Sequence, residues 1–365
     1  MTEHKYWLGF SLVPGIGTKR TLNLLNKFGQ LSSAWKANET QLLEAGLEAQ
    51  PTHNLLQFRK KIDLERELAR VERVKAWLLT FADANYPSLL KQIADPPLVL
   101  YVRGTLTPQD ERALCIVGTR KASVSGRDTA YAMATQLAQN DITIISGLAQ
   151  GIDEAAHRGA LDGGGRTVAV SACGINTIYP EQHIELAHQI VESGAVITEF
   201  PIGTPPIRGN FPRRNRIMSG MALGVVVVEA PEKSGALITA NVAAEQGRDV
   251  FAIPGNILNP ASSGTNRLIQ DGAKLVMSVK DILDELDITQ VAVQSKIITE
   301  MISPANDTEA TILQFLGADP IHIDEIVRQS GLPTAVVSST LTILELKGLA
   351  QMVGAMQYNL IHKRL

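Results

Sequence analysis

The stretch between Leu114 and Gly174 restricts the fold more than any other part of the chain. It contains three short strands, Leu114–Val117, Ile142–Ile145 and Val168–Val170, which are apolar and rich in β-branched residues, with segments of helical length between them. Strands that are apolar throughout suit a parallel sheet buried on both faces, and their alternation with helices indicates βαβ units. We therefore predict an α/β fold that binds ligands at the carboxyl ends of its strands.

The same alternation continues to Met277. We expect further strands at Ala195–Phe200, Val225–Glu229, Val250–Ile253 and Leu275–Met277, and a strand at Leu98–Val102 that adds to the edge of the sheet. The segments between them predict helices at Glu181–Glu192, Arg214–Ala222, Ala236–Gln246 and Thr265–Gln270. This pattern predicts an extended Rossmann-like, doubly wound sheet of about seven to nine strands.

A chain of 365 residues is long for a single core, so two or three domains are expected. The N-terminal part is predicted to be all-α, of helix-hairpin-helix or sterile-alpha-motif type. Pro14, Gly15 and Gly17 there force a tight turn between two helices. Such a turn either offers backbone N–H groups to a phosphate or is an ordinary helical hairpin. The expected divisions are 1–80 helical, 81–288 Rossmann-like, 289–308 linker and 309–365 winged helix.

The winged-helix prediction rests on three helical segments followed by a short hairpin. Its recognition helix, Thr334–Lys347, places Ser338, Ser339 and Thr342 on the expected outer face, with few cations. Proteins that bind duplex DNA carry more Lys and Arg on that helix. We therefore expect this domain to contact protein or to support a dimer.

Composition narrows the class of protein. The net charge is −3, so any argument for nucleic-acid binding must come from local clusters of charge. No apolar run reaches the roughly 20 residues of a membrane span, and the first ten residues do not resemble a secretory signal, so we expect a cytoplasmic protein with no membrane partner. Cys115 and Cys173 lie in or beside apolar strands and are expected to be inert. Without a CxxC pair, a GxGxxG motif or a Walker A motif, we predict no metal and no cofactor.

Two basic clusters are the most informative chemical feature. Both follow predicted strands and contain no acidic residue, so topology places them at strand carboxyl ends, where they can line one groove. Arginine forks bind phosphate at two points, and Phe211 can stack on an exposed base, which favours single-stranded nucleic acid. The alternative is a set of structural arginines paired with buried acids such as Glu199 and Glu229. The cluster residues are Arg120, Lys121, Arg127, Arg208, Arg213, Arg214 and Arg216, with Asn210 beside Phe211.

The arguments for a functional role are weaker for the other candidate residues near the strand ends. Asp153 and His157 are four residues apart and share a helix face, as an acid–base pair or as a helix cap beside a hydrogen-bonded histidine. Ser146 lacks the G-x-S-x-G context of a nucleophile. Ser234 and Thr239 suit a helix start and an anion contact. Glycines near the strand ends are expected to let a ligand approach the backbone. The residues predicted to line or support the pocket are Gly118, Ser146, Gly147, Gly151, Asp153, His157, Ser234, Gly235 and Thr239.

Several motifs, in order, resemble the DprA/Smf family, the DNA-processing proteins of natural transformation. They are Ile116–Arg120, Ser146–Asp153, Ile178–Pro180, Phe211–Arg216, Ser234–Thr239 and Val250–Gly255, and the resemblance spans residues 86–277. It implies an extended Rossmann fold that binds single-stranded DNA without cutting it. It also implies a homodimer that loads the RecA recombinase for homologous recombination, with single-strand-binding protein as a further partner.

The same resemblance implies which residues contact DNA. Arg120, Arg208 and Phe211 match the family's contacts, and Asn210 with the stretch Arg213–Arg216 lies beside them. Glu181 stands where the family often has a basic residue. Two other functions remain open at this stage: a nucleotide-processing enzyme that uses the strand-end pocket, and a regulator that binds duplex DNA through the winged helix.

Overall fold

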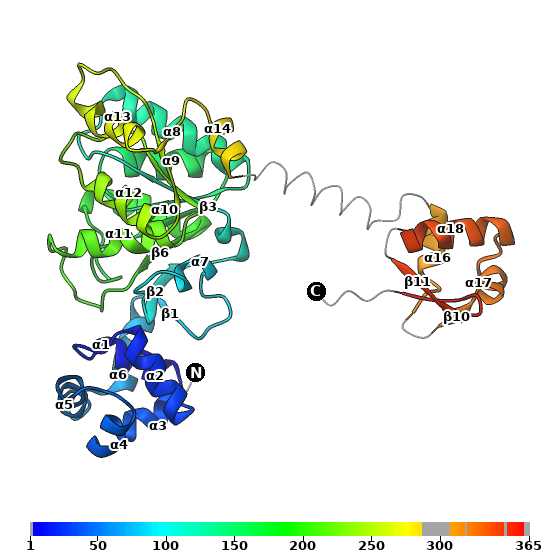
Figure 1. Cartoon of the computed structure of the whole chain (residues 1–365), viewed down its shortest axis with the longest axis horizontal. Helices are drawn as coiled ribbons and strands as arrows, with labels where there is room; N and C mark the ends of the chain where they lie inside the picture. Colours follow the sequence, from blue (N-terminus) through cyan, green and yellow to red (C-terminus); the bar gives the residue numbers. More distant parts are fainter. Residues whose placement is uncertain (1–2, 287–306, 318–319, 347–348, 361–365) are drawn as a thin grey trace. The chain divides into compact units, whose positions relative to one another are not determined.

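The computed structural model describes residues 3–286, 307–317, 320–346 and 349–360. The chain divides into two compact units, Met1–Ile282 and Leu283–Leu365, which are described separately below (Figure 1). Nearly all of the linker predicted at 289–308 lies outside the described residues. Its last two positions already belong to helix α16 (Asp307–Leu313).

Short helices form the N-terminal part of the first unit, as the sequence predicts. They pack around a core that includes Trp7, Phe10, Leu24 and Trp35, with the Phe10 and Trp35 rings edge to face at 5.2 Å. The helices are α1 (His4–Leu12), α2 (Thr18–Phe28), α3 (Leu31–Lys36), α4 (Glu39–Glu44), α5 (Ala49–Phe58) and α6 (Leu64–Arg73) (Figure 1).

The glycine-rich turn between α1 and α2 is held by internal contacts. Gly15 has a φ of +85°, which suits glycine. Arg20 donates to the Gly15 carbonyl at 3.0 Å and forms a two-point ion pair with Glu48, at 2.7 and 2.8 Å. This pair lowers the pKa of Glu48 to about 2. The hydroxyl of Thr18 donates to the Pro96 carbonyl. The positive charge of Arg20, the arginine nearest the turn, is therefore already balanced by the carboxylate of Glu48.

A nine-stranded sheet forms the rest of the first unit and confirms the doubly wound prediction. Its order is β1-β2-β6-β5-β4-β3-β7-β8-β9; the pairs β1–β2 and β2–β6 are antiparallel and the others parallel. The strands are β1 (Trp77–Thr80), β2 (Val99–Gly104), β3 (Ala113–Val117), β4 (Thr143–Ser146), β5 (Thr167–Val170), β6 (Ala195–Thr198), β7 (Gly224–Val227), β8 (Asp249–Ala252) and β9 (Lys274–Leu275).

Two sequence-based expectations about the sheet were wrong. Strand β1 lies inside the segment 1–80 that the sequence predicts to be helical, and it displaces β2 from the expected edge position. The amphipathic pattern of α6 ends at Val74, and Lys75 turns the chain with a φ of +54°. The four residues of β1 that follow are too short to show a period of their own.

Helices cover both faces of the sheet, and β5 shows how its side chains alternate. Val168 and Val170 pack in the same cluster as Ile217 of helix α11 (Asn210–Gly220), whereas Ala169 packs with Leu186 of helix α10 (Ile184–Ser193). This alternation follows from the two-residue period of a strand. The other long helices of this unit are α8 (Val124–Gln139), α9 (Ile152–Asp162), α12 (Gly235–Glu245) and α13 (Ser263–Gln270), with the short helix α7 (Ser88–Lys91). Helix α14 (Val279–Glu285) contains the boundary between the two units.

The strand order reverses at β3, which lies between β4 and β7. After β3 the chain builds strands β4 to β6 on one side, and it then returns to place β7 on the other. Ligands of open α/β sheets bind where such a reversal leaves a crevice at the carboxyl ends. The loops after β3 and β7 are tied together there, because Glu229 accepts hydrogen bonds from the backbone of Thr119 at 2.7 Å and of Ser123 at 2.8 Å.

The second unit confirms the winged-helix prediction. Helices α16, α17 (Ile323–Ser330) and α18 (Thr334–Leu346) pack with a three-stranded sheet, in the order β10 (Ile321–His322), β12 (Gln357–Leu360) and β11 (Ala350–Gly354). On α18, Ser338, Ser339 and Thr342 are exposed, as expected. The described residues of this helix include no Lys or Arg.

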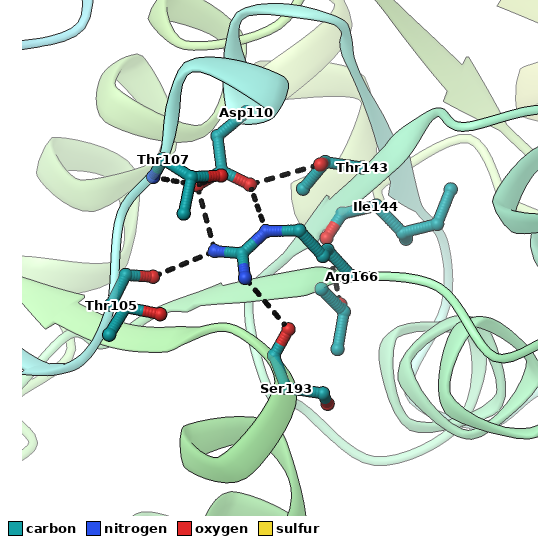
Figure 2. Close-up of polar contacts among 8 residues, drawn as sticks. Thr105, Thr107, Asp110, Thr143, Ile144, Arg166 and Ser193 are labelled. Atoms are coloured by element: carbon teal, nitrogen blue, oxygen red, sulfur yellow. Dashed lines mark hydrogen bonds and ion pairs between the residues drawn. The ribbon is translucent and has the colours of Figure 1, made fainter.

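At the amino ends of the parallel strands, a buried ion pair joins three segments. Arg166 forms a two-point pair with Asp110, at 2.9 and 3.0 Å, and donates to the carbonyls of Thr105 and Ser193 (Figure 2). The hydroxyl of Thr143 at the start of β4 also donates to Asp110, at 3.0 Å. Arg166 is a basic residue near a glycine run, but these contacts make it structural, at the end of the sheet opposite the crevice.

We predict that Arg166→Ala lowers the free energy of unfolding by about 3 kcal/mol, because it leaves the Asp110 carboxylate buried without its partner. Arg166→Lys should lose part of that amount, since an ammonium cannot replace the two-point fork. Arg267→Ala removes an exposed pair with Asp271 and should cost under about 1 kcal/mol. Urea unfolding followed by circular dichroism tests this, and equal effects of Arg166→Ala and Arg267→Ala would contradict it.

Candidate nucleic-acid interface

Two adjoining hollows lie at the carboxyl ends of the strands. The switch-point pocket, with a volume of about 650 Å³, is lined by the loops after β3 and β7 and by the first turns of α11 and α12, including Thr119, Arg208 and Ser234. The aromatic pocket, of about 390 Å³, is lined by residues that include Tyr179, Glu181 and the loop after β4. Arg120, Tyr179 and Phe211 line both pockets and form the wall between them.

This wall is a stack of one cation and two rings. The guanidinium carbon of Arg120 lies 4.8 Å from the centroid of the Phe211 ring. The Tyr179 ring meets Phe211 edge to face, with centroids 5.9 Å apart. Arg120 and Tyr179 are exposed and Phe211 is half-buried, so part of this stack is accessible to a ligand. The three residues come from the loops after β3 and β5 and from α11.

Phe211 lies in a helix, although the sequence predicts that this helix starts only at Arg214. Helix α11 begins at Asn210, four residues before the expected start, so Phe211 lies in its first turn. Pro212 makes this start hard to predict from the sequence, because proline commonly interrupts a helix. Within the first turn, however, the missing N–H has no helical partner to lose. The helix fixes Phe211 against the rest of the fold more firmly than a loop would.

Several of the predicted cations are exposed around these pockets. Arg208 lines the switch-point pocket, and Arg120 and Lys121 line a third hollow with Arg127. Arg213 is also exposed, with its guanidinium carbon 5.2 Å from the Phe200 ring centroid. All of these lie near the carboxyl ends of the strands, as predicted.

Lys233 also lines the switch-point pocket, and the sequence did not single it out. Glu232 precedes it and no other cation is near it in the chain, so it belongs to no basic cluster. The sequence feature that could have identified Lys233 was its position between β7 and α12, at the carboxyl end of a strand.

Two arginines of the cluster between Arg208 and Arg216 point inward, which corrects their assignment as DNA contacts. Arg214 is 4% exposed and donates from Nη1 to the carbonyls of Gly147, at 2.7 Å, and of Val170. Arg216 pairs with Glu199, which was the alternative for this cluster. Spacing signals the burial of Arg214, because Arg214, Ile217, Met218 and Met221 follow the i, i+3, i+4, i+7 pattern of a buried helix face. Asn210 is also buried, at 4% exposure.

The glycines near the strand ends mostly make room for the protein's own groups. A Cβ on Gly147 would lie 2.5 Å from the Arg214 guanidinium, and one on Gly118 would lie 2.4 Å from Ile152. Gly151 has a φ of +85°, and a Cβ there would lie 2.5 Å from the Thr119 carbonyl. At these three positions the protein's own groups take the space that a side chain would need, although all three glycines line the pockets at the strand ends. At Gly235 the space is open.

Asp153 and His157 share helix α9 but serve different parts of the fold. A carboxylate oxygen of Asp153 accepts hydrogen bonds from the backbone of Gly147 and Ala149, at 3.1 and 3.3 Å. Burial raises the pKa of this carboxyl, and the nearby Arg214 opposes the rise. Asp153 thus shapes the loop after β4 that also receives Arg214.

His157 contacts the hydroxyl of Thr167 at 2.7 Å. That hydroxyl donates to the Ile144 carbonyl, so His157 must carry its proton on Nδ1. Burial lowers the pKa of His157 to about 3 and keeps it neutral near pH 7. The histidine is therefore a hydrogen-bonded structural group with no bond to Asp153.

The remaining pocket residues are also accounted for. The hydroxyl of Ser146 donates to the Ile116 carbonyl at 2.6 Å, so it joins β4 to β3. Ser234 caps helix α12, as predicted, by accepting from the backbone of Ala236. Thr239, on the same helix, is 1% exposed and lines the switch-point pocket. Over the described ranges, no cluster of three or more His, Cys, Asp or Glu could hold a metal ion, and no helix could cross a membrane.

Two family models match this sequence. The model of DNA recombination-mediator protein A matches residues 77–287, and that of the DprA winged helix domain matches residues 300–355. Protein Smf of Synechocystis is 33% identical over 98% of each chain. The DNA processing protein DprA of Bacillus subtilis is 37% identical over 69% of this chain and 88% of its own length.

Solved structures of similar proteins share the fold. The structure of DprA from Streptococcus pneumoniae has a TM-score of 0.68 and 34% sequence identity, and the match covers 78% of this chain and 98% of that one. A structure of DprA from Helicobacter pylori, described as showing a single-stranded DNA binding mode, has a TM-score of 0.52 and 27% identity over 58% of this chain and 97% of that one.

Adjacent arginines provide a test of this geometry. We predict that Arg214→Ala lowers the free energy of unfolding by about 3–5 kcal/mol, because it removes two buried hydrogen bonds and the positive charge beside Asp153. Arg213→Ala removes an exposed side chain one position away and should change stability by about 0.5 kcal/mol or less. Urea unfolding of the two variants measures both values. A stability loss in Arg213→Ala as large as that in Arg214→Ala would refute the inward placement of Arg214.

Proposed function

The chain belongs to the DprA/Smf family of DNA-processing proteins, and from this premise we propose that it binds single-stranded DNA across the Arg120–Phe211 wall without cutting it. The observation that carries the proposal is the combination of aromatic surface and exposed cations at one end of the sheet. Stacked aromatic rings hold unpaired bases of any sequence, and arginines hold the phosphates between them. The relative from Helicobacter pylori, described by its single-stranded DNA binding mode, supports the same function here.

Within this proposal each side chain has a role. Arg208 and Lys233 bind phosphate in the switch-point pocket, next to the amino end of helix α12, where backbone N–H groups also favour an anion. Phe211 stacks on a base. Arg120 bridges the two, since its guanidinium lines both pockets. Lys121 and Arg213 add positive charge at the rim.

A nucleotide-processing enzyme is the other candidate for the same pocket. The geometry favours binding, because Asp153 is occupied by backbone hydrogen bonds and His157 by Thr167. Ser146 also donates to a backbone carbonyl and sits buried in the sheet. We therefore propose a non-catalytic role for the chain.

We further propose that the bound strand is passed to the RecA recombinase during natural transformation, in the cytoplasm and beside single-strand-binding protein. Family membership supports this step, including the match to a model described as a recombination mediator. The winged-helix unit suits a contact with protein, because the described part of its helix α18 offers Ser and Thr and no cation.

A homodimer belongs to the same proposal and has support in exposed apolar residues. Ile257, Leu258 and Met277 are 87%, 85% and 82% exposed. They follow β8 and β9, the last two strands of the sheet, and β9 is an edge strand. Strongly exposed apolar side chains that follow the last strands of a sheet support a surface that another chain covers.

We predict that the protein binds a single-stranded oligonucleotide more tightly than the duplex of the same sequence, and more weakly as salt increases. Arg120→Ala and Arg208→Ala should each weaken binding and lower the slope of log affinity against log salt by about 0.7, the value for one phosphate contact on a single strand. Gel-shift titrations at several salt concentrations measure this. Arg66→Ala, an exposed arginine of α6 outside the pockets, is the matched control. An unchanged slope in both groove variants, or a preference for duplex, would exclude the proposed interface.

We predict that Ile257→Asp weakens self-association by about tenfold or more, because it places a charge in the core of the proposed dimer interface. Sedimentation velocity over a range of protein concentrations measures the dimer fraction. Leu43→Asp changes an apolar residue of α4 that is 45% exposed, and it should leave the dimer intact. A wild-type protein that stays monomeric at all concentrations, or an equal loss in both variants, would reject this surface as the interface.

A further inference from the structure

Glu229, in the loop after β7, is a buried acid that holds the loop carrying Arg120. This loop, residues 118–123, joins β3 to α8. The backbone N–H of Thr119 donates to the Glu229 carbonyl at 2.7 Å, and the backbone N–H of Ser123 donates to the Glu229 carboxylate at 2.8 Å. Glu229 is 5% exposed. A single buried residue thus holds the loop both before and after Arg120.

The backbone fixes the place of this carboxylate. Val228 donates to the Val117 carbonyl at 3.1 Å, so the pairing of β7 with β3 continues past the strand ends as far as Glu229. The carboxylate lies at the amino end of α8, where Ser123 is the N-cap and its hydroxyl accepts from the backbone of Gly126 at 2.9 Å. The free N–H groups and the dipole of a helix favour an anion at that end.

Gly126, in the first turn of α8, makes room for the carboxylate. A Cβ on Gly126 would lie 2.5 Å from the oxygen of Glu229 that accepts from Ser123. The backbone of Gly126 is helical, and alanine stabilises a helix more than glycine does. The glycine therefore weakens its own helix slightly and leaves space in which Glu229 reaches the loop.

We propose that Glu229 is a positioning residue for single-stranded DNA, because it fixes the backbone from which Arg120 reaches Phe211. This inference rests on the proposed function and adds to it a residue that acts through Arg120. A long arginine side chain has many rotamers, so its contact with a ligand depends on a fixed backbone at its base. Arg120 is exposed and lines both pockets, whereas buried Glu229 is not one of the described residues that line them.

The first test compares two substitutions of Glu229 in the full chain, titrated with an all-thymine oligonucleotide by fluorescence anisotropy. We expect Glu229→Ala to weaken binding by about fivefold, as the loss of one ordinary hydrogen bond would, because Arg120 keeps its charge and loses its fixed place. Glu229→Gln keeps an acceptor oxygen for the Ser123 N–H and should stay within about twofold of the wild-type affinity. An equal loss in both variants would overturn the proposal.

Gly126→Ala tests the same contact without changing any charge. Its Cβ should push the Glu229 carboxylate away from Ser123, so we expect a loss of affinity similar to that of Glu229→Ala. This variant also provides the test if Glu229→Ala does not fold. Asp110→Asn is the control for a general loss of stability, because it weakens a buried ion pair at the opposite end of the sheet and should keep the wild-type affinity. A loss in Asp110→Asn as large as that in Gly126→Ala would refute the positioning role.

Combining Glu229→Ala with Arg120→Ala separates positioning from a general structural role. A positioning residue matters only while Arg120 is present, so Glu229→Ala should change affinity by less than about twofold in the Arg120→Ala background. The same fivefold loss in both backgrounds would show that Glu229 acts on the fold as a whole. Wild-type affinity in both Glu229→Ala and Gly126→Ala would overturn the positioning role alone. Failure of the wild-type protein to bind the strand would instead overturn the proposed function.

Discussion

The candidate interface depends on the Arg214 guanidinium, which fills the space left by the missing side chain of Gly147. Its hydrogen bonds to the carbonyls of Gly147 and Val170 join helix α11 to the ends of β4 and β5. Burial lowers the pKa of Arg214, so the fold must compensate for placing a charge inside. Asp153, on helix α9 after β4, supplies the opposite charge. Its carboxylate also accepts hydrogen bonds from the backbone N–H groups of Gly147 and Ala149 in the loop after β4.

The exposed side chains of α11 follow from this buried one. Successive residues of a helix are rotated by about 100°, so with Arg214 inside, Arg213 faces solvent. Phe211, three residues before Arg214 on an adjacent part of the helix surface, reaches the wall with Arg120. The geometry of the interface therefore depends on the buried contacts of Arg214. This also explains why one run of basic residues serves two purposes, with Arg214 and Arg216 holding the fold and Arg208 and Arg213 facing outward.

Much of the fold could be predicted from the sequence, because the strands Leu114–Val117, Ile142–Ile145 and Val168–Val170 are rich in apolar, β-branched residues and alternate with segments of helical length. The location of the interface followed from the rule that ligands bind at strand carboxyl ends. Strand β1 and the start of α11 were missed, since four residues carry no clear period and Pro212 resembles a helix end. The burial of Arg214 was also missed, because it depends on the position of this residue around the helix, and a cluster of charges in the sequence does not reveal that position.

The distribution of paired and exposed cations explains how a chain with a net charge of −3 can present a basic surface. Arg20 pairs with Glu48 beside the N-terminal turn, and Arg166 pairs with Asp110 at the amino ends of the strands. Such pairs cancel at short range and contribute little field in water. Around the switch-point pocket, by contrast, Arg208 has no acidic neighbour in the lining except the buried Asp153. The local field at the crevice is thus positive although the whole chain is acidic, because the field there is determined by the pairing of charges and not by composition.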